Sequence, residues 1–158
     1  MEVEQSIAVA IGGLGAAGAL AWLAMYGVAR YRQRQIWCQA RDLFRLRREW
    51  LEAEFVSRGP EHCKLRNLMW TDCEFTDAVS FARHRSTGQL RAFLGVVISF
   101  ETSPASGGES VGAVCEMRVA TALFCYECGT WRTDGRVVFN LSPSETCCRY
   151  RHELEILE

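Results

Sequence analysis

Hydrophobic and polar positions divide the chain into three stretches with different periods. Residues 7–29 contain no charged side chain and almost no polar one. Residues 30–57 repeat apolar side chains at helical spacing, whereas residues 67–141 largely alternate with a period of two. The pattern therefore predicts an apolar helix, an amphipathic helix and a β-rich region, in that order.

The first stretch is long enough for a transmembrane helix. Its 23 residues would extend roughly 34 Å as a helix, against a hydrocarbon core about 30 Å thick. Trp22 and Tyr26 lie toward its C-terminal end, where amphipathic rings favour the membrane interface. A cleaved signal peptide ending near Ala21 fits less well, because the segment before the apolar run is acidic and that run continues past Ala21. We therefore expect a single-pass anchor at residues 1–29.

Charge is distributed unevenly around this anchor. Residues 1–29 carry two glutamates and no basic side chain, residues 30–48 carry seven arginines against one aspartate, and residues 49–158 carry 11 basic against 16 acidic side chains. By the positive-inside rule, this distribution predicts an N-terminus outside the cell membrane and a C-terminal domain in the cytosol.

The anchor also contains small residues at a spacing that lets two helices approach closely. The spacing of four predicts a homodimer or a partner helix, although small residues are abundant here in any case. The residues are Gly12, Gly15, Ala16 and Ala19.

Residues 30–59 are predicted to form a basic juxtamembrane helix that ends at Gly59-Pro60. Arg30, Arg32 and Arg34 would contact anionic lipid headgroups, or simply fix the topology of the anchor. We do not expect nucleic-acid binding, because the domain that follows is acidic as a whole.

The rest of the chain, residues 60–158, is predicted to be a soluble α+β domain. Five antiparallel strands are expected at 67–75, 77–84, 89–101, 111–127 and 131–141. Ser86-Thr87-Gly88 predicts a hairpin turn, and the third strand is apolar on both faces in its second half, which predicts a central position. In the fourth strand, the odd-numbered residues from Cys115 to Cys125 are expected to face the core.

The last element is predicted from a capping box, Ser142-Pro143-Ser144-Glu145. We expect the helix that follows to run to the C-terminal end, because four apolar residues after the box form a helical stripe. These are Cys147, Tyr150, Leu154 and Leu157.

Eight cysteines are many for this length, and in a cytosolic domain they should be reduced thiols. Cys125 and Cys128 have the spacing of half a zinc site, and Cys148 with His152 could complete it from one face of the last helix. Buried cysteines that simply pack as small apolar residues are the simpler interpretation.

Catalytic chemistry finds little support in the sequence. Cys73 follows Asp72, whose charge would disfavour a thiolate, and His84 lies between two arginines at a hairpin end. The chain has no Gly-rich phosphate loop, HExxH motif or G-x-S-x-G motif. We therefore expect a non-enzymatic protein without a cofactor, zinc excepted.

Three segments resemble a group of small bacterial proteins with an N-terminal hydrophobic segment, an Arg-rich helix and a β-rich region. The segments are WTDCEF (70–75), FARHRSTGQLRAFLGVVISFE (81–101) and WRTDGRVVFNLSPSE (131–145). The shared positions include Trp70, Gly88 and Gly135 but neither Cys125 nor Cys128, which weakens the zinc hypothesis. The group has no assigned activity, so the resemblance implies an architecture and no mechanism.

Together these patterns predict a membrane-tethered, non-enzymatic cytosolic α+β module that binds a protein partner or a small ligand. A zinc-stabilised membrane-anchored domain is the alternative.

Overall fold

The computed structural model describes the backbone of residues 2–62, 68–102 and 115–157, and the side chains of residues 22–61, 69–101 and 116–157. The chain divides into two units, residues 1–41 and residues 42–158.

The first unit is formed by helix α1 (Glu2–Leu46) as far as residue 41. Most of the predicted span at 7–29, including Gly12, Gly15, Ala16 and Ala19, falls on side chains outside the described residues. Among the residues that the structure does describe, no helix is long and apolar enough to cross a membrane. Arg30, Arg32 and Arg34 are exposed.

The predicted amphipathic helix is not continuous. A break at Arg47 separates α1 from α2 (Arg48–His62). Helix α2 also continues through Pro60, so the predicted end at residue 59 is wrong by three residues. The backbone bond that proline removes lies in the last turn of this helix, where helix ends fray in any case.

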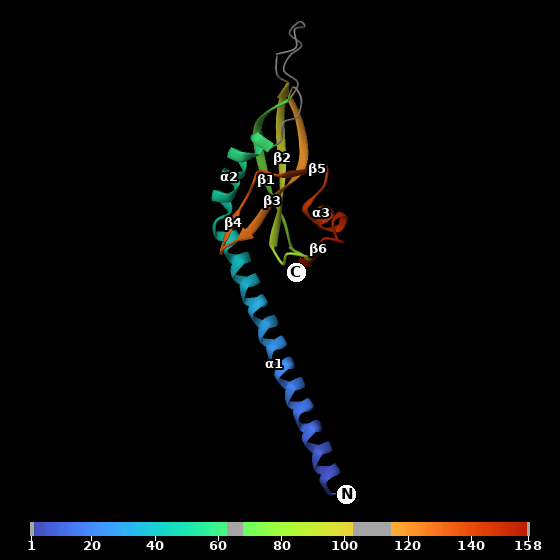
Figure 1. The fold of residues 1–158 in the computed structure, drawn as a ribbon. Coiled ribbons are helices and arrows are strands. Elements are labelled where there is room, and N and C mark those ends of the chain that lie inside the picture. The colour runs from blue at the N-terminus through green and yellow to red at the C-terminus, as the bar shows by residue number, and fades with distance from the viewer. Residues whose placement is uncertain (1, 63–67, 103–114, 158) are drawn as a thin grey trace. The chain divides into compact units, whose positions relative to one another are not determined.

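The second unit is built around one antiparallel sheet, which confirms the predicted α+β class (Figure 1). The strand order is β4-β3-β2-β1-β6. Strand β5 pairs with β3 as well, on a different stretch of β3 from the one that pairs with β4. The central position predicted for the strand at 89–101 is therefore correct for β2. The strands are β1 (Leu68–His84), β2 (Leu90–Thr102), β3 (Cys115–Glu127), β4 (Thr130–Arg132), β5 (Val137–Phe139) and β6 (Leu154–Leu157).

The two strands predicted at 67–75 and 77–84 are a single bulged strand, β1. Phe75 pairs with Val96 and Val79 pairs with Leu94, so three residues of β1 lie opposite Gly95 alone. A Cβ atom at position 95 would collide with Oγ1 of Thr76. Glycine is required here because the bulge fills the space above the central strand.

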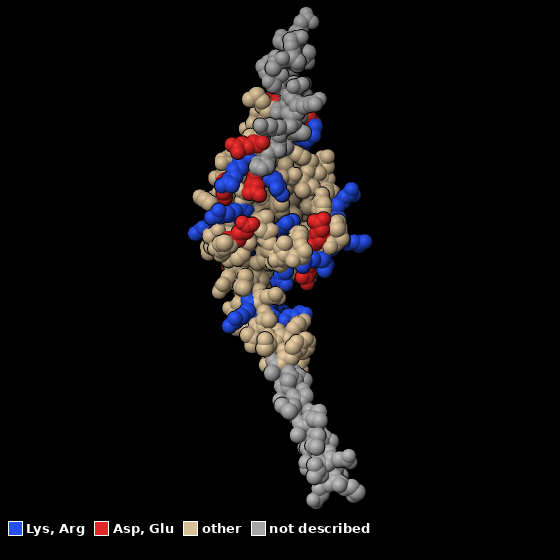
Figure 2. Space-filling model, viewed as in Figure 1, with Lys and Arg blue, Asp and Glu red and all other residues tan. Residues whose placement is uncertain are grey.

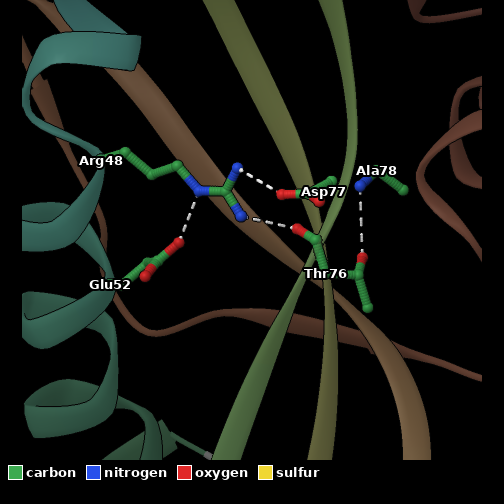
Figure 3. A network of polar contacts seen from close by, with 5 residues as sticks. All are labelled: Arg48, Glu52, Thr76, Asp77 and Ala78. Carbon is green, nitrogen blue, oxygen red and sulfur yellow. Dashed lines mark hydrogen bonds and ion pairs between the residues drawn. The ribbon is translucent and has the colours of Figure 1, made fainter.

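Arg48 ties this bulge to helix α2 (Figure 3). Its Nη2 donates to the carbonyl oxygen of Thr76 at 2.7 Å, and its Nε pairs with Oε1 of Glu52 at 2.7 Å. A third contact, to Oδ1 of Asp77 at 3.3 Å, involves a fully exposed carboxylate. The first two contacts hold the helix and the bulge together, because hydrogen bonds to a charged group are the stronger ones.

The C-terminal prediction is only half correct. Helix α3 (Pro143–Arg149) begins with the predicted capping box, in which Ser142 and Glu145 bond to each other's backbone N–H groups. The helix then ends at Arg149, and residues 154–157 form strand β6 beside β1. The leucines at 154 and 157 fit a helical stripe, but Leu154-Glu155-Ile156-Leu157 also begins with the alternation of a strand.

The main core lies between α2 and one face of the sheet. The even-numbered residues of β2 from Leu90 to Phe100 are all buried on this face, as predicted for their shared face. Phe44 contacts Phe81, Phe124 and Trp131 in edge-to-face geometry, which such aromatic pairs prefer. We call this side the aromatic face.

The opposite side, which we call the α3 face, is only partly covered. Phe93 of β2 and Cys147 of α3 belong to a small buried cluster there, and α2 and α3 lie on opposite sides of the sheet (Figure 1). Because β3 pairs Phe124 with Ala92, its even-numbered residues lie on the aromatic face. The prediction that its odd-numbered residues face the core is therefore wrong for Met117 and Val119, which are 68% and 58% exposed.

Candidate anion-binding site

A tight turn and a bulge shape the outer edge of the sheet. Cys128 and Gly129 connect β3 to β4, and both have positive φ (49° and 81°), as in type I′ hairpin turns. After β4 the chain leaves the ladder for four residues and returns to β3 as β5. One predicted strand at 131–141 is thus two short strands around the predicted bend at Asp134-Gly135.

Hydrogen bonds fix the four residues of this bulge. The hydroxyl of Thr133 donates to the carbonyl of Leu123 at 2.8 Å and accepts from the backbone N–H of Gly135 at 3.1 Å. Gly135 has φ +77°, and a Cβ atom there would come within 2.6 Å of the carbonyl carbon of Arg58. Only glycine lets this segment approach α2 so closely.

Four arginines surround a cavity of about 190 Å³ beside this bulge. They come from four segments that are distant along the chain: α2, β2, β4 and the bulge itself. We call it the arginine cavity. The arginines are Arg58, Arg91, Arg132 and Arg136.

Three of the four guanidinium groups lack a carboxylate partner. Arg58 pairs with Oε1 of Glu54 at 3.0 Å. Within the described part of the chain, Arg91, Arg132 and Arg136 form no ion pair. The Nε atom of Arg91 is also buried without a hydrogen-bond partner there. Buried polar groups are normally satisfied, so an unsatisfied donor beside a cavity needs an explanation.

The other walls are acidic and apolar. Glu127 and Asp134 line the cavity, and Oε1 of Glu127 accepts a hydrogen bond from Gln89. Leu123 and Cys125 complete the lining. The lining residues therefore carry four positive and two negative charges, although residues 49–158 as a whole are acidic. Figure 2 shows basic and acidic side chains intermingled on the visible face of this unit.

Cys125 is poorly suited to act as a thiolate in this cavity. Burial raises its pKa most, and Glu127 and Asp134 raise it further, while Arg91 and Arg136 oppose the shift. Thiolate is the form that attacks electrophiles and binds metals. The side chain is therefore a neutral thiol in the wall of the cavity.

The structure places the four residues of the zinc hypothesis on separate elements. Cys125 lies on β3 and Cys128 is exposed in the turn after it, whereas Cys148 is exposed on α3. His152 follows the end of α3, so the expected helical face shared with Cys148 does not form. Among the described side chains, no three His, Cys, Asp or Glu residues are grouped so that they could hold a metal ion. Zinc binding stays a prediction, which metal analysis of the purified chain tests.

Cys73 and His84, the candidates for catalysis, contact neighbouring side chains of the fold. Burial raises the pKa of Cys73 to about 11, an effect that the Trp70 indole opposes and Asp72 reinforces. The indole N–H of Trp70 donates to the Cys73 sulfur at 2.6 Å. The ring nitrogen Nδ1 of His84 lies 3.0 Å from the hydroxyl of Ser86, within the β1–β2 turn. These contacts give both side chains a structural role.

The arginine cavity was not predicted from the sequence. Arg91 gave the best signal, since it is a charged residue within a central strand that is mainly apolar, although it lies near the start of that strand. Arg132 and Arg136 flank the predicted bend, but nothing local relates them to Arg58 of α2. No known protein family, curated protein or solved structure matches the chain.

Proposed function

We propose that this protein is a membrane-tethered, non-enzymatic module whose C-terminal domain binds a small anionic ligand in the arginine cavity. The observation that carries the proposal is the convergence on one cavity of three arginines that form no ion pair within the described part of the chain, in a domain that is acidic as a whole. Guanidinium groups offer paired N–H donors that match the oxygens of carboxylates and phosphates.

Ligand binding is tested by equilibrium dialysis of the full chain in neutral detergent against phosphate, sulfate, citrate and acetate. Saturable binding of at least one anion near one equivalent per chain supports the proposal. Affinity should fall in the double variant Arg91→Gln/Arg136→Gln and remain in the control Arg151→Gln, which removes an exposed arginine outside the cavity. Absence of saturable binding by any of the four anions would contradict it.

The membrane tether rests on the sequence of residues 7–29, which lacks charge. The proposed orientation has the N-terminus outside and the domain in the cytosol, because the arginines follow the span. Alkaline carbonate extraction should leave the chain in the membrane pellet. The variant Leu14→Arg/Gly18→Arg should be extracted, since each arginine at a span centre costs about 2.5–3.5 kcal/mol. Extraction of the unchanged chain would overturn the tether.

Two further contacts of the tether are proposed. Gly12, Gly15, Ala16 and Ala19 would form the contact between two copies, and cross-linking in membranes should lose the dimer in Gly15→Leu. Arg30, Arg32 and Arg34 would lie against anionic headgroups. If cross-linking yields only monomer for the unchanged chain, the dimer is excluded.

A further inference from the structure

We propose that the arginine cavity binds a small phosphate monoester whose body carries hydroxyl groups. This inference rests on the proposed function above and names its ligand class. Two features of the cavity distinguish such a ligand from other anions: the directions of its donors and the acidic groups in its wall.

The donors reach the cavity from several sides. Arg91 lies on the central strand, Arg132 on the outer strand and Arg136 in the bulge, while Arg58 reaches in from α2. A carboxylate is planar and is satisfied by one or two guanidinium forks in its plane. The three terminal oxygens of a phosphate monoester point in three directions, so donors from separate elements suit it better.

The cavity keeps a net positive charge. Arg58 is paired with Glu54, and the other three arginines against Glu127 and Asp134 leave about one positive charge. A phosphate monoester carries about −1.5 to −2 at pH 7, because its second pKa is about 6. The charge therefore favours an anion, and the directions of the donors favour the phosphate group.

The two acidic side chains suggest what the rest of the ligand is like. A carboxylate in the wall repels a second anionic group but accepts hydrogen bonds from hydroxyl groups. Asp134 forms no ion pair or side-chain hydrogen bond within the described part of the chain, so its oxygens are open to a ligand. Leu123 offers an apolar surface for the carbon skeleton of the same ligand.

The same chemistry has two sources, a soluble phosphate monoester and a lipid headgroup that ends in one. Glycerol 3-phosphate represents the first, and a short-chain lysophosphatidic acid below its micelle concentration, which keeps one free hydroxyl group, represents the second. Both share the phosphate monoester, so the ratio of their affinities identifies the source without changing the site.

The test is calorimetric titration of the full chain in neutral detergent with glycerol 3-phosphate and with glycerate, which replaces the phosphate by a carboxylate. We expect glycerol 3-phosphate to bind at least tenfold more tightly, and methyl phosphate, which lacks hydroxyl groups, to bind less tightly than glycerol 3-phosphate. Affinity for glycerol 3-phosphate should rise between pH 5 and pH 7.5 as the phosphate gains its second charge. Arg136→Gln should lower that affinity at least tenfold, with Arg151→Gln as the charge-matched control.

The outcomes separate this inference from the proposed function. Equal or tighter binding of glycerate would overturn the phosphate inference and leave a general anion site in place. Equal binding of methyl phosphate and glycerol 3-phosphate would overturn the role of the hydroxyl groups. If neither phosphate compound nor glycerate binds, the proposed function fails with it. Tighter binding of lysophosphatidic acid than of glycerol 3-phosphate would support the inference and assign the ligand to a lipid headgroup.

Discussion

The two faces of the sheet differ in what their side chains do. On the aromatic face, large side chains from α1, α2 and strands β1, β2, β3 and β4 are buried together, and Phe124 is fully buried. The α3 face carries a small cluster under α3, leaves Met117 and Val119 exposed, and includes Arg91 and Cys125 of the arginine cavity. The comparison indicates that stability resides mainly on the aromatic face, whereas the candidate site uses the less covered one.

The largest expected effect is the loss of an aromatic ring from the core. Phe124→Ala should cost about 3–5 kcal/mol of unfolding free energy, because the ring is fully buried and its neighbours cannot close the cavity completely. Met117→Ala on the same strand should cost no more than about 0.5 kcal/mol, since its side chain faces solvent. Urea unfolding of both variants measures the difference, and equal losses would contradict the division between the two faces.

The second-largest loss of stability is expected from a substitution at the bulge of β1. Gly95→Ala should destabilise the domain by about 1–3 kcal/mol, as overpacking does, because the new Cβ meets Oγ1 of Thr76. Thr76→Ala removes that atom, so the double variant should regain part of the loss. A double-mutant cycle measured by urea unfolding checks this coupling. Strict additivity would show that the bulge adjusts to the methyl group.

Arg48 should have a smaller effect. Arg48→Met removes the bonds to Thr76 and Glu52 and should cost about 1 kcal/mol, less than a buried charged hydrogen bond because the guanidinium is partly exposed. Asp77→Asn should change the unfolding free energy by less than about 0.5 kcal/mol. A larger effect for Asp77→Asn than for Arg48→Met would show that the exposed ion pair, and not the backbone contact, holds the bulge.

Substitutions in the arginine cavity should lower the affinity for anions and hardly change stability, unlike substitutions in the core. Arg136→Gln should change the unfolding free energy by no more than about 0.5 kcal/mol, because its guanidinium has no ion-pair partner among the described residues. The same substitution should abolish most of the affinity for anions. A large loss of stability would indicate a structural arginine instead of a binding one.

The smallest effect concerns the helix cap on the α3 face. Hydrogen bonds from the side chain and the backbone N–H of Ser142 lower the pKa of Glu145, which is exposed. A lowered folded-state pKa contributes stability above the unfolded pKa, near 4.3, and that contribution is lost as the pH falls through the folded value. The stability difference between the unchanged chain and Glu145→Gln should therefore be present at pH 7 and disappear as the pH falls below the lowered folded-state pKa of Glu145. An NMR titration in which Ser142→Ala leaves the pKa of Glu145 unchanged would contradict the cap as its cause.

Local signals predicted much of this fold. The turn before Gly88, the central strand and the capping box of α3 all depend on neighbouring residues, and the structure confirms them. The side of β3 that faces the core was predicted wrongly because its core face begins with Glu116 and Arg118, whereas Met117 and Val119 are apolar and exposed. Strand β6 was missed because no glycine or proline marks the end of α3.

The candidate site is formed by residues that are distant along the chain, so patterns among neighbouring residues could not predict it. Arg58 and Arg136 meet only because Gly135 lets the bulge approach α2. The cysteine pair at 125 and 128 has a recognisable spacing, and one of its members, Cys125 of β3, lines the cavity.

The central claim is that this cavity binds an anion in the folded state. The most direct measurement is the unfolding free energy of the full chain with and without glycerol 3-phosphate, at constant ionic strength, for the unchanged chain and for Arg91→Gln/Arg136→Gln. At a ligand concentration 100 times its Kd, linkage predicts a gain of about 2.7 kcal/mol for the unchanged chain, and almost none for the double variant at the same concentration. An equal gain in both chains, or no gain in either, would contradict a specific site.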